Sequence, residues 1–148
     1  MALGISTACL YPMAMEDSLQ TLIDSGFREF EIFINTYSEM EPEFLTMLEE
    51  KLKPQGCRVK SLHPFTSGFE SYLLFSNYER RFQDGASFYR RYFEMARRLG
   101  AEVLVIHGDR SFEKSGLNDR EYYDRFGILS RIASDYGVTP APENVKAL

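Results

Sequence analysis

The sequence predicts an α/β protein with parallel strands, and two observations predict this class. A helix-like pattern that ends at a glycine and leads directly into a short apolar run occurs four times in 148 residues. A strand-like run also precedes the first of these units. Because helix-length segments separate the strands, neighbouring strands must pair in parallel through crossovers, since tight hairpins join only antiparallel strands.

The four glycines locate the units along the chain. The apolar stripes of the predicted helices end at Gly26, Gly56, Gly100 and Gly137, and glycine is the residue that most readily takes the left-handed conformation after a helix. An alternating or continuously apolar run follows each glycine. In a single domain, 1–148, we expect strands over residues 3–10, 28–34, 58–63, 102–107 and 138–143.

The last two predicted strands carry further expectations. The run from Val103 to Ile106 is continuously apolar, which predicts a strand that is buried on both faces. Pro140 and Pro142 remove two backbone donors from the fifth strand. Residues two apart direct their N–H groups toward the same side, so both lost donors can face away from the fourth strand and leave that pairing intact.

The segment over residues 64–85 separates the third strand from its helix and is rich in aromatic side chains. Connections of this length are usually functional or disordered, and the aromatic content favours function. Two alternatives remain: a lid over the mouth that the strand ends form, and a small surface helix packed on the rest of the fold.

Composition excludes several classes of function. With 44% hydrophobic and 26% charged residues, the chain is globular and not disordered. Its net charge of −5 argues against a nucleic-acid or anionic-membrane partner. It has neither a positively charged leader nor a membrane-length apolar run. We therefore expect a cytoplasmic protein that binds a small molecule or another protein.

The only two histidines of the chain occupy equivalent places in successive units. His63 and His107 each lie seven residues after the glycine of their unit, and Glu143 lies six residues after its own. Side chains at the carboxyl ends of parallel strands gather at one edge, where such folds place their chemistry. Imidazole and carboxylate together suit Zn²⁺, Mn²⁺ or Co²⁺. The spacing alone leaves metal binding and structural capping of the strand ends as equal alternatives.

These strand ends, with their neighbours, resemble the xylose-isomerase-like barrel family. The resembling segments are Gly4-Ile5-Ser6-Thr7, Glu31, Ser61-Leu62-His63, Leu99 to Gly108 and Glu143-Asn144-Val145, and they span nearly the whole chain. Periodicity alone leaves an open sheet and a barrel both open, although no GxGxxG or Walker loop favours the open sheet. The resemblance implies the first half of a TIM barrel, incomplete after strand 5, because a full barrel has eight units in about 250 residues.

The sugar isomerase and epimerase branch of that family implies a chemistry. There, the glutamate that matches Glu143 binds a divalent metal (Mn, Co, Mg or Zn) and can act as acid or base, and histidines matching His63 and His107 line the pocket for a sugar or sugar phosphate. We accordingly expect Glu143 to be catalytic, Glu143 and His107 to bind metal, and His63, His107 and Glu31 to bind substrate. In the apurinic-endonuclease branch the three strand ends resemble zinc ligands, but the acidic balance disfavours DNA.

The chain departs from the family pattern in its length. The later strands of the family supply an aspartate, a histidine and a second glutamate, and no positions here match them. We therefore expect a truncated isomerase or epimerase whose metal site is incomplete, or else an inactive half-barrel that works as an assembly or binding module. Exposed strand edges predict self-association. A natural half-barrel and an interrupted gene are both consistent with the sequence.

Overall fold

In the computed structural model, which describes residues 3–108 and 116–143, five strands form one sheet in the order β1-β2-β3-β4-β5. Every pairing is parallel. Consecutive order is that of a barrel sheet, whereas a doubly wound sheet reverses direction at a switch point. The α/β class is therefore confirmed, and the sheet is that of a partial TIM barrel. The strands are β1 (Gly4–Ser6), β2 (Glu29–Phe33), β3 (Arg58–His63), β4 (Val103–Ile106) and β5 (Thr139–Pro142).

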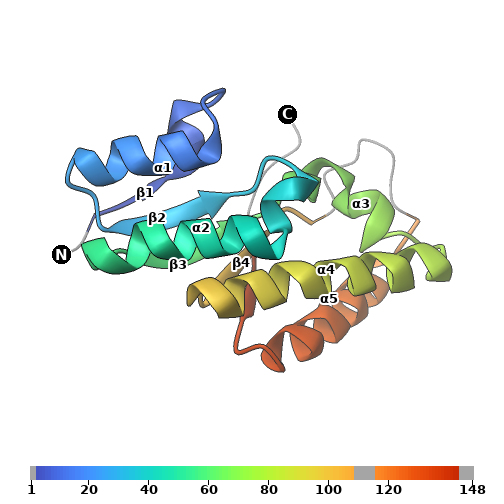
Figure 1. Cartoon of the computed structure of the whole chain (residues 1–148). Helices are drawn as coiled ribbons and strands as arrows, with labels where there is room; N and C mark the ends of the chain where they lie inside the picture. Colours follow the sequence, from blue (N-terminus) through green and yellow to red (C-terminus); the bar gives the residue numbers. More distant parts are fainter. Residues whose placement is uncertain (1–2, 109–115, 144–148) are drawn as a thin grey trace.

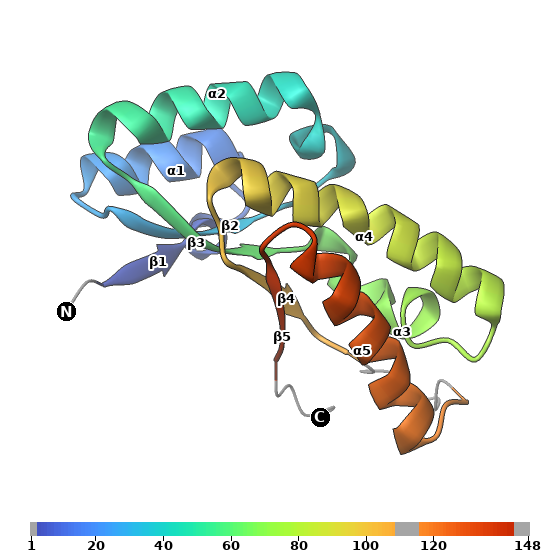
Figure 2. The ribbon, with the colours of Figure 1, turned by 90° about the horizontal axis from the view of Figure 1, so that it is seen from below.

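The helices lie along one side of the curved sheet, and the described residues place none on the other side (Figure 1, Figure 2). Each long helix ends in a glycine-containing turn that returns the chain to the sheet, as the units predicted. No helix in the described part of the chain has the length and apolar character needed to cross a membrane. The helices are α1 (Met15–Asp24), α2 (Pro42–Leu52), α3 (Glu70–Leu73), α4 (Glu79–Leu99) and α5 (Asp119–Ser134).

The hydrophobic core lies between the helices and the sheet, and the opposite face of the sheet is partly open. In β2 and β4 alternate residues are buried against the helices, and in β3 the two buried residues lie on either side of the register irregularity. These residues are Phe30, Ile32, Leu104 and Ile106, and Val59 and Leu62. The prediction that β4 is buried on both faces is wrong, because Val103 and Val105 are only partly buried. They point to the side of the sheet that no described helix covers.

The first strand is shorter than the predicted span of residues 3–10. It ends at Ser6, and Thr7–Leu10 form a 3-10 turn. Two hydroxyl groups explain the early end: the Ser6 hydroxyl accepts a hydrogen bond from the Ala8 amide (3.3 Å), and the Thr7 hydroxyl accepts one from the Phe33 amide (2.9 Å). Side-chain oxygens thus replace backbone carbonyls at the end of the ladder.

The aromatic segment over residues 64–85 is packed, as the second of the two alternatives predicted. It holds a 3-10 turn (Phe65–Phe69), α3 and the first turns of α4. Glu70, Leu74 and Phe75 are each at most 1% exposed. The segment therefore forms a fixed wall at the carboxyl ends of β3 and β4.

The prolines of β5 leave its pairing with β4 intact, which confirms the expectation. The Thr139 amide donates to the Glu102 carbonyl (2.8 Å) and the Glu143 amide to the Ile106 carbonyl (2.7 Å). Since alternate residues of a strand direct their amides to the same side, the nitrogens of Pro140 and Pro142 face away from β4.

Candidate active site

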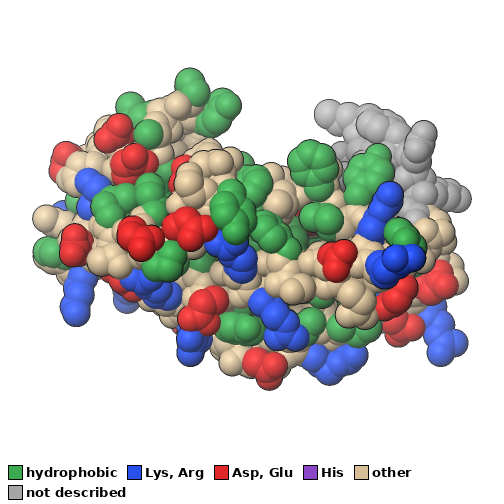
Figure 3. All heavy atoms as spheres, turned by 45° about the vertical axis from the view of Figure 1, so that its right-hand side comes forward, with side chains coloured by type: hydrophobic (Ala, Val, Ile, Leu, Met, Phe, Trp, Pro, Cys, Tyr) green, Lys and Arg blue, Asp and Glu red, His purple; other side chains and the backbone are tan. Residues whose placement is uncertain are grey.

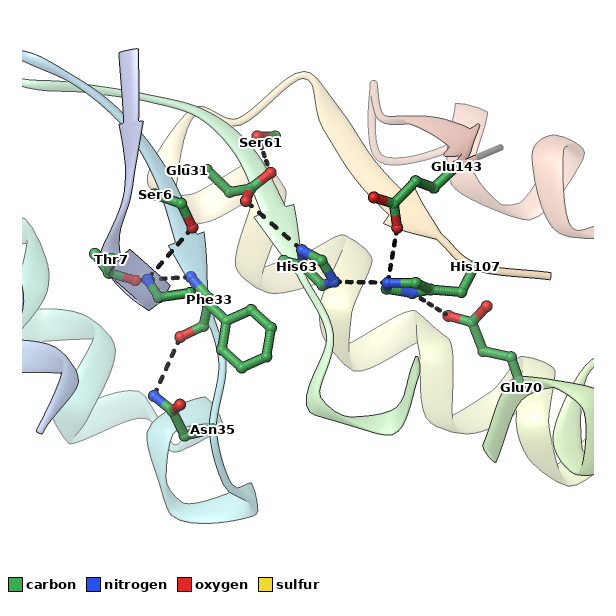
Figure 4. A network of polar contacts seen from close by, with 11 residues as sticks. Ser6, Thr7, Glu31, Phe33, Asn35, Ser61, His63, Glu70, His107 and Glu143 are labelled. Carbon is green, nitrogen blue, oxygen red and sulfur yellow. Dashed lines mark hydrogen bonds and ion pairs between the residues drawn. The ribbon is translucent and has the colours of Figure 1, made fainter. Parts of the chain in front are cut away.

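His63, His107 and Glu143 meet at the carboxyl ends of β3, β4 and β5 (Figure 4). The Nε2 atoms of the two imidazoles are 2.9 Å apart, and Nε2 of His107 is also 2.9 Å from Oε2 of Glu143. One ligand atom from each residue lies within 4.8 Å of the others. His107 is buried, whereas Glu143 is exposed. The three residues that the spacing singled out are thus brought together.

Glu31 lies behind His63 on the neighbouring strand. Its Oε1 atom is 3.6 Å from Nδ1 of His63, and its Oε2 atom accepts a hydrogen bond from the Ser61 hydroxyl at 3.0 Å. The His63 imidazole, together with the hydroxyls of Ser6 and Ser61, holds the pKa of Glu31 below its ordinary value, although partial burial acts in the opposite direction. A charged carboxylate at Nδ1 favours the orientation in which Nε2 points to the centre of the site.

A register irregularity between Phe30 and Glu31 produces this arrangement. Phe30 pairs with Val59, but Glu31 pairs with Ser61, so one residue of β3 is skipped. Irregularities of this kind re-aim a side chain next to a site. The carboxylate of Glu31 consequently stands beside the Ser61 hydroxyl and the His63 ring.

A second carboxylate, Glu70, lies behind His107, and no spacing in the sequence predicted its place there. It is fully buried, and its Oε1 atom is 3.9 Å from Nδ1 of His107. It accepts hydrogen bonds from the Gly108 amide (2.7 Å) and from the Tyr89 hydroxyl (2.9 Å). A signal was available, because Glu70 is the single charged residue between Pro64 and Tyr78.

The donor set fits a divalent cation. A neutral imidazole keeps a lone pair on one ring nitrogen, and a carboxylate offers only lone pairs. Nε2 of His107 lies 2.9 Å both from Nε2 of His63 and from Oε2 of Glu143, which is the separation of an ordinary hydrogen bond. Where these atoms carry lone pairs and no proton lies between them, a divalent cation held by His107 and Glu143 would remove their mutual repulsion.

On the face drawn in Figure 3, hydrophobic side chains gather in the middle, with Lys, Arg, Asp and Glu interspersed around them. The ring of Phe33 lies 4.8 Å from that of His63, between centroids. Half-exposed aromatic and polar groups thus border the imidazoles.

Comparison with solved structures identifies the fold. No family model matches the sequence, and no curated protein matches it. A D-tagatose 3-epimerase-like protein matches with a TM-score of 0.78 and 21% identity over 98% of this chain and 53% of its own. A D-psicose 3-epimerase from Clostridium cellulolyticum H10 matches with a TM-score of 0.74 and 14% identity over 96% and 52%. This chain has the fold of the xylose-isomerase-like TIM barrels.

The likeness extends across xylose-isomerase-like barrels of different description. A 3-keto-D-glucoside 4-epimerase from E. coli matches with a TM-score of 0.68 and 16% identity, over 96% of this chain and 55% of its own. The chain spans about half the length of these structures. The resemblance noted in the sequence is confirmed in the fold. Asn144 and Val145, which contributed to it, lie outside the described residues.

Proposed function

We propose that this chain carries part of the active site of a metal-dependent sugar or sugar-phosphate isomerase or epimerase. The convergence of His63, His107 and Glu143 at the carboxyl ends of three adjacent strands is the observation that supports it. TIM barrels place their active sites at this end. The solved structures that share the fold include proteins described as sugar 3-epimerases and a 4-epimerase.

In this proposal, each residue has a defined role. Glu143 and His107 bind a divalent cation, which when present polarises a sugar carbonyl. Glu143 is also the exposed carboxylate of the group, so it can accept a proton from the carbon next to that carbonyl. His63 orients a substrate hydroxyl, and Glu31 fixes the direction of the His63 ring.

In this proposal, the described residues supply only one of the two proton transfers that epimerisation needs. Epimerisation removes a proton from one face of a carbon and returns a proton to the other face, which calls for a second proton-transferring group. Within the described residues, Glu31 and Glu70 are engaged behind the imidazoles. We assign cation binding and one proton transfer to this chain, and the second transfer to a complementary part of a complete barrel.

Thermal unfolding with Mn²⁺ or Co²⁺ tests the metal site. Binding to the folded state should raise the melting temperature, since a ligand at 100 times its Kd adds about 2.7 kcal/mol. Glu143→Gln, which keeps the shape of the side chain, should remove most of the rise. Glu102→Gln is the control, because Glu102 is exposed and precedes β4 at the opposite end of the sheet. A rise that survives in Glu143→Gln would overturn the assignment.

The open face of the sheet favours a second candidate function, an inactive half-barrel that acts as an assembly module. Val103 and Val105 of β4 are partly exposed there. A covering partner, including a second copy of the chain, would bury them. Sedimentation over a range of concentrations tests this: a concentration-dependent dimer without metal binding supports the module, and a monomer that binds Mn²⁺ supports the enzyme.

The apurinic-endonuclease alternative remains a prediction of the sequence. It calls for binding to abasic DNA with a strong dependence on salt, because phosphate contacts release counterions. A filter-binding titration at low salt with an abasic duplex tests it, and a lack of binding there would remove it.

A further inference from the structure

Both imidazoles of the site turn one nitrogen to the centre and the other to a carboxylate (Figure 4). Nδ1 of His63 faces Glu31 at 3.6 Å, and Nδ1 of His107 faces Glu70 at 3.9 Å. The first carboxylate belongs to the sheet, whereas the second comes from α3 in the aromatic segment. The two histidines thus share one arrangement built from unrelated elements.

Glu70 is held in a fixed position. Its side chain has no exposure, and both of its oxygens accept hydrogen bonds, one from the Gly108 amide and one from the Tyr89 hydroxyl. Tyr89 in turn contacts the Thr66 hydroxyl at 3.0 Å. Burial, and then the neighbouring Glu70, raise the pKa of Tyr89 well above its ordinary value, which keeps the phenol a donor. A carboxylate buried at such cost needs every available donor.

One ring nitrogen beside Glu70 forms no hydrogen bond. Nδ1 of His107 is buried and has no hydrogen-bond partner among the described residues. A buried donor without a partner costs about 1–3 kcal/mol. The distance from Nδ1 to the Glu70 oxygen exceeds a normal hydrogen bond by about 1 Å, so a small tilt of the ring completes the contact. In the other tautomer, Nδ1 of His107 would carry a lone pair facing the Glu70 carboxylate, and the two would repel each other.

We propose that Glu70 is a positioning residue that holds His107 in the tautomer with the proton on Nδ1. Nε2 then presents its lone pair to the centre of the site. The inference rests on the proposed function for what Nε2 meets there, a divalent cation or a substrate hydroxyl. Without a ligand, Oε2 of Glu143 lies 2.9 Å from Nε2 and competes with Glu70 for this proton. The tautomer is therefore tested in Glu143→Ala, where Glu70 is the carboxylate that remains beside the ring. Carboxylate partners of this kind orient metal-binding histidines and increase their basicity.

Nitrogen-15 NMR of the imidazoles tests the tautomer directly. The chain has only two histidines, and a His63→Gln variant assigns their signals. At a pH that keeps both rings neutral, we expect His107 of Glu143→Ala to carry its proton on Nδ1, because the competing carboxylate at Nε2 is gone. A Glu143→Ala spectrum with the proton on Nε2 would overturn the proposal.

The substitution Glu70→Gln, made in the Glu143→Ala background, sharpens this test. A glutamine amide offers a donor where the carboxylate offered an acceptor, so the His107 population should move toward the form with the proton on Nε2. Glu39→Gln is the matched control: Glu39 is also buried and also holds a backbone amide, that of Asn35 at 2.6 Å. A purely structural role of Glu70 predicts lower stability with an unchanged tautomer, and that result refutes the proposal.

Cation affinity provides the second readout and separates the two proposals. Loss of such a partner typically weakens metal binding about 10–100-fold, so we expect the Kd for Mn²⁺ to rise by this factor in Glu70→Gln and to stay constant in Glu39→Gln. If wild-type protein binds no Mn²⁺ yet Glu143→Ala shows the Nδ1 proton, the metal proposal fails and the positioning role stands. Equal Mn²⁺ affinity in wild type and Glu70→Gln refutes the positioning role.

Discussion

The Nε2 atoms of His63 and His107 lie 2.9 Å apart, although the two residues are separated by 44 positions in the chain. Their ring centroids are 4.6 Å apart. The contact arises because β3 pairs directly with β4 and each histidine follows its strand's apolar residues. Equivalent positions in successive units of a parallel sheet therefore become neighbours in the site.

The orientation of His63 leads to a prediction about acid stability. In metal-free buffer, Glu31→Gln should remove a pH-dependent stabilisation, because the pKa of Glu31 in the folded state is below its ordinary value of 4.5. Glu31 therefore binds a proton more readily in the unfolded chain than in the folded one. Its contribution to the free energy of unfolding is complete above about pH 4.5 and is lost as the pH falls through the pKa of Glu31 in the folded state.

Urea unfolding of wild type and Glu31→Gln at a series of pH values measures this contribution. The difference in free energy of unfolding should be widest near neutral pH and should narrow in acid. Ser61→Ala removes a donor to Glu31 and so raises the pKa of Glu31 in the folded state. In a Ser61→Ala background, the stabilisation by Glu31 should therefore be lost at a higher pH. A difference that does not vary with pH would contradict the prediction.

The buried hydroxyl of Tyr89 leads to a second prediction. Tyr89→Phe removes a donor from the fully buried Glu70, and we expect the free energy of unfolding to fall by about 1–3 kcal/mol. Tyr123→Phe is the control, since Tyr123 is 70% exposed and surface substitutions change stability by about 0.5 kcal/mol or less. Equal losses in the two variants would mean that the hydroxyl network contributes nothing.

Local patterns predicted most of the sheet. The four unit glycines were assigned from helical periodicity, and all of them have positive φ values. The strands after them begin within two residues of the predicted positions. The hydrophobic periodicity of a helix and the glycine that caps it are properties of short stretches of sequence. In these four units, no contact with a distant part of the chain overrides them. The strand-end positions of His63, His107 and Glu143 follow from the same spacing.

Long-range contacts explain what the sequence did not reveal. The early end of β1 depends on a hydrogen bond that the Phe33 amide donates to the Thr7 hydroxyl, 26 residues away. The partial exposure of Val105 depends on what lies across the sheet, which no pattern within β4 encodes. Glu70 acquires its role only when α3 is packed against the end of β4.

Two valines test whether the open face of the sheet is open in solution. Val59 faces the helices and is 3% exposed, whereas Val105 is partly exposed on the other face. We expect Val59→Ala to lower the free energy of unfolding by about 2 kcal/mol and Val105→Ala to lower it by well under half of that. Equal costs would show that a partner covers the open face, and dilution should then reduce the cost at Val105.

The alternation of amides in β5 yields the last prediction. The amide of Ala141 lies on the same side as those of Thr139 and Glu143, which donate to β4. Ala141→Pro should therefore break the ladder and lower the free energy of unfolding by about 2 kcal/mol or more. Pro142→Ala should change the free energy of unfolding by about 1 kcal/mol or less, because the nitrogen of residue 142 faces away from β4.

The substitution Pro142→Ala also adds a backbone donor to the outer edge of β5, so light scattering should rise if that edge recruits other chains. Equal losses from the two substitutions would show that the prolines do not face the free edge.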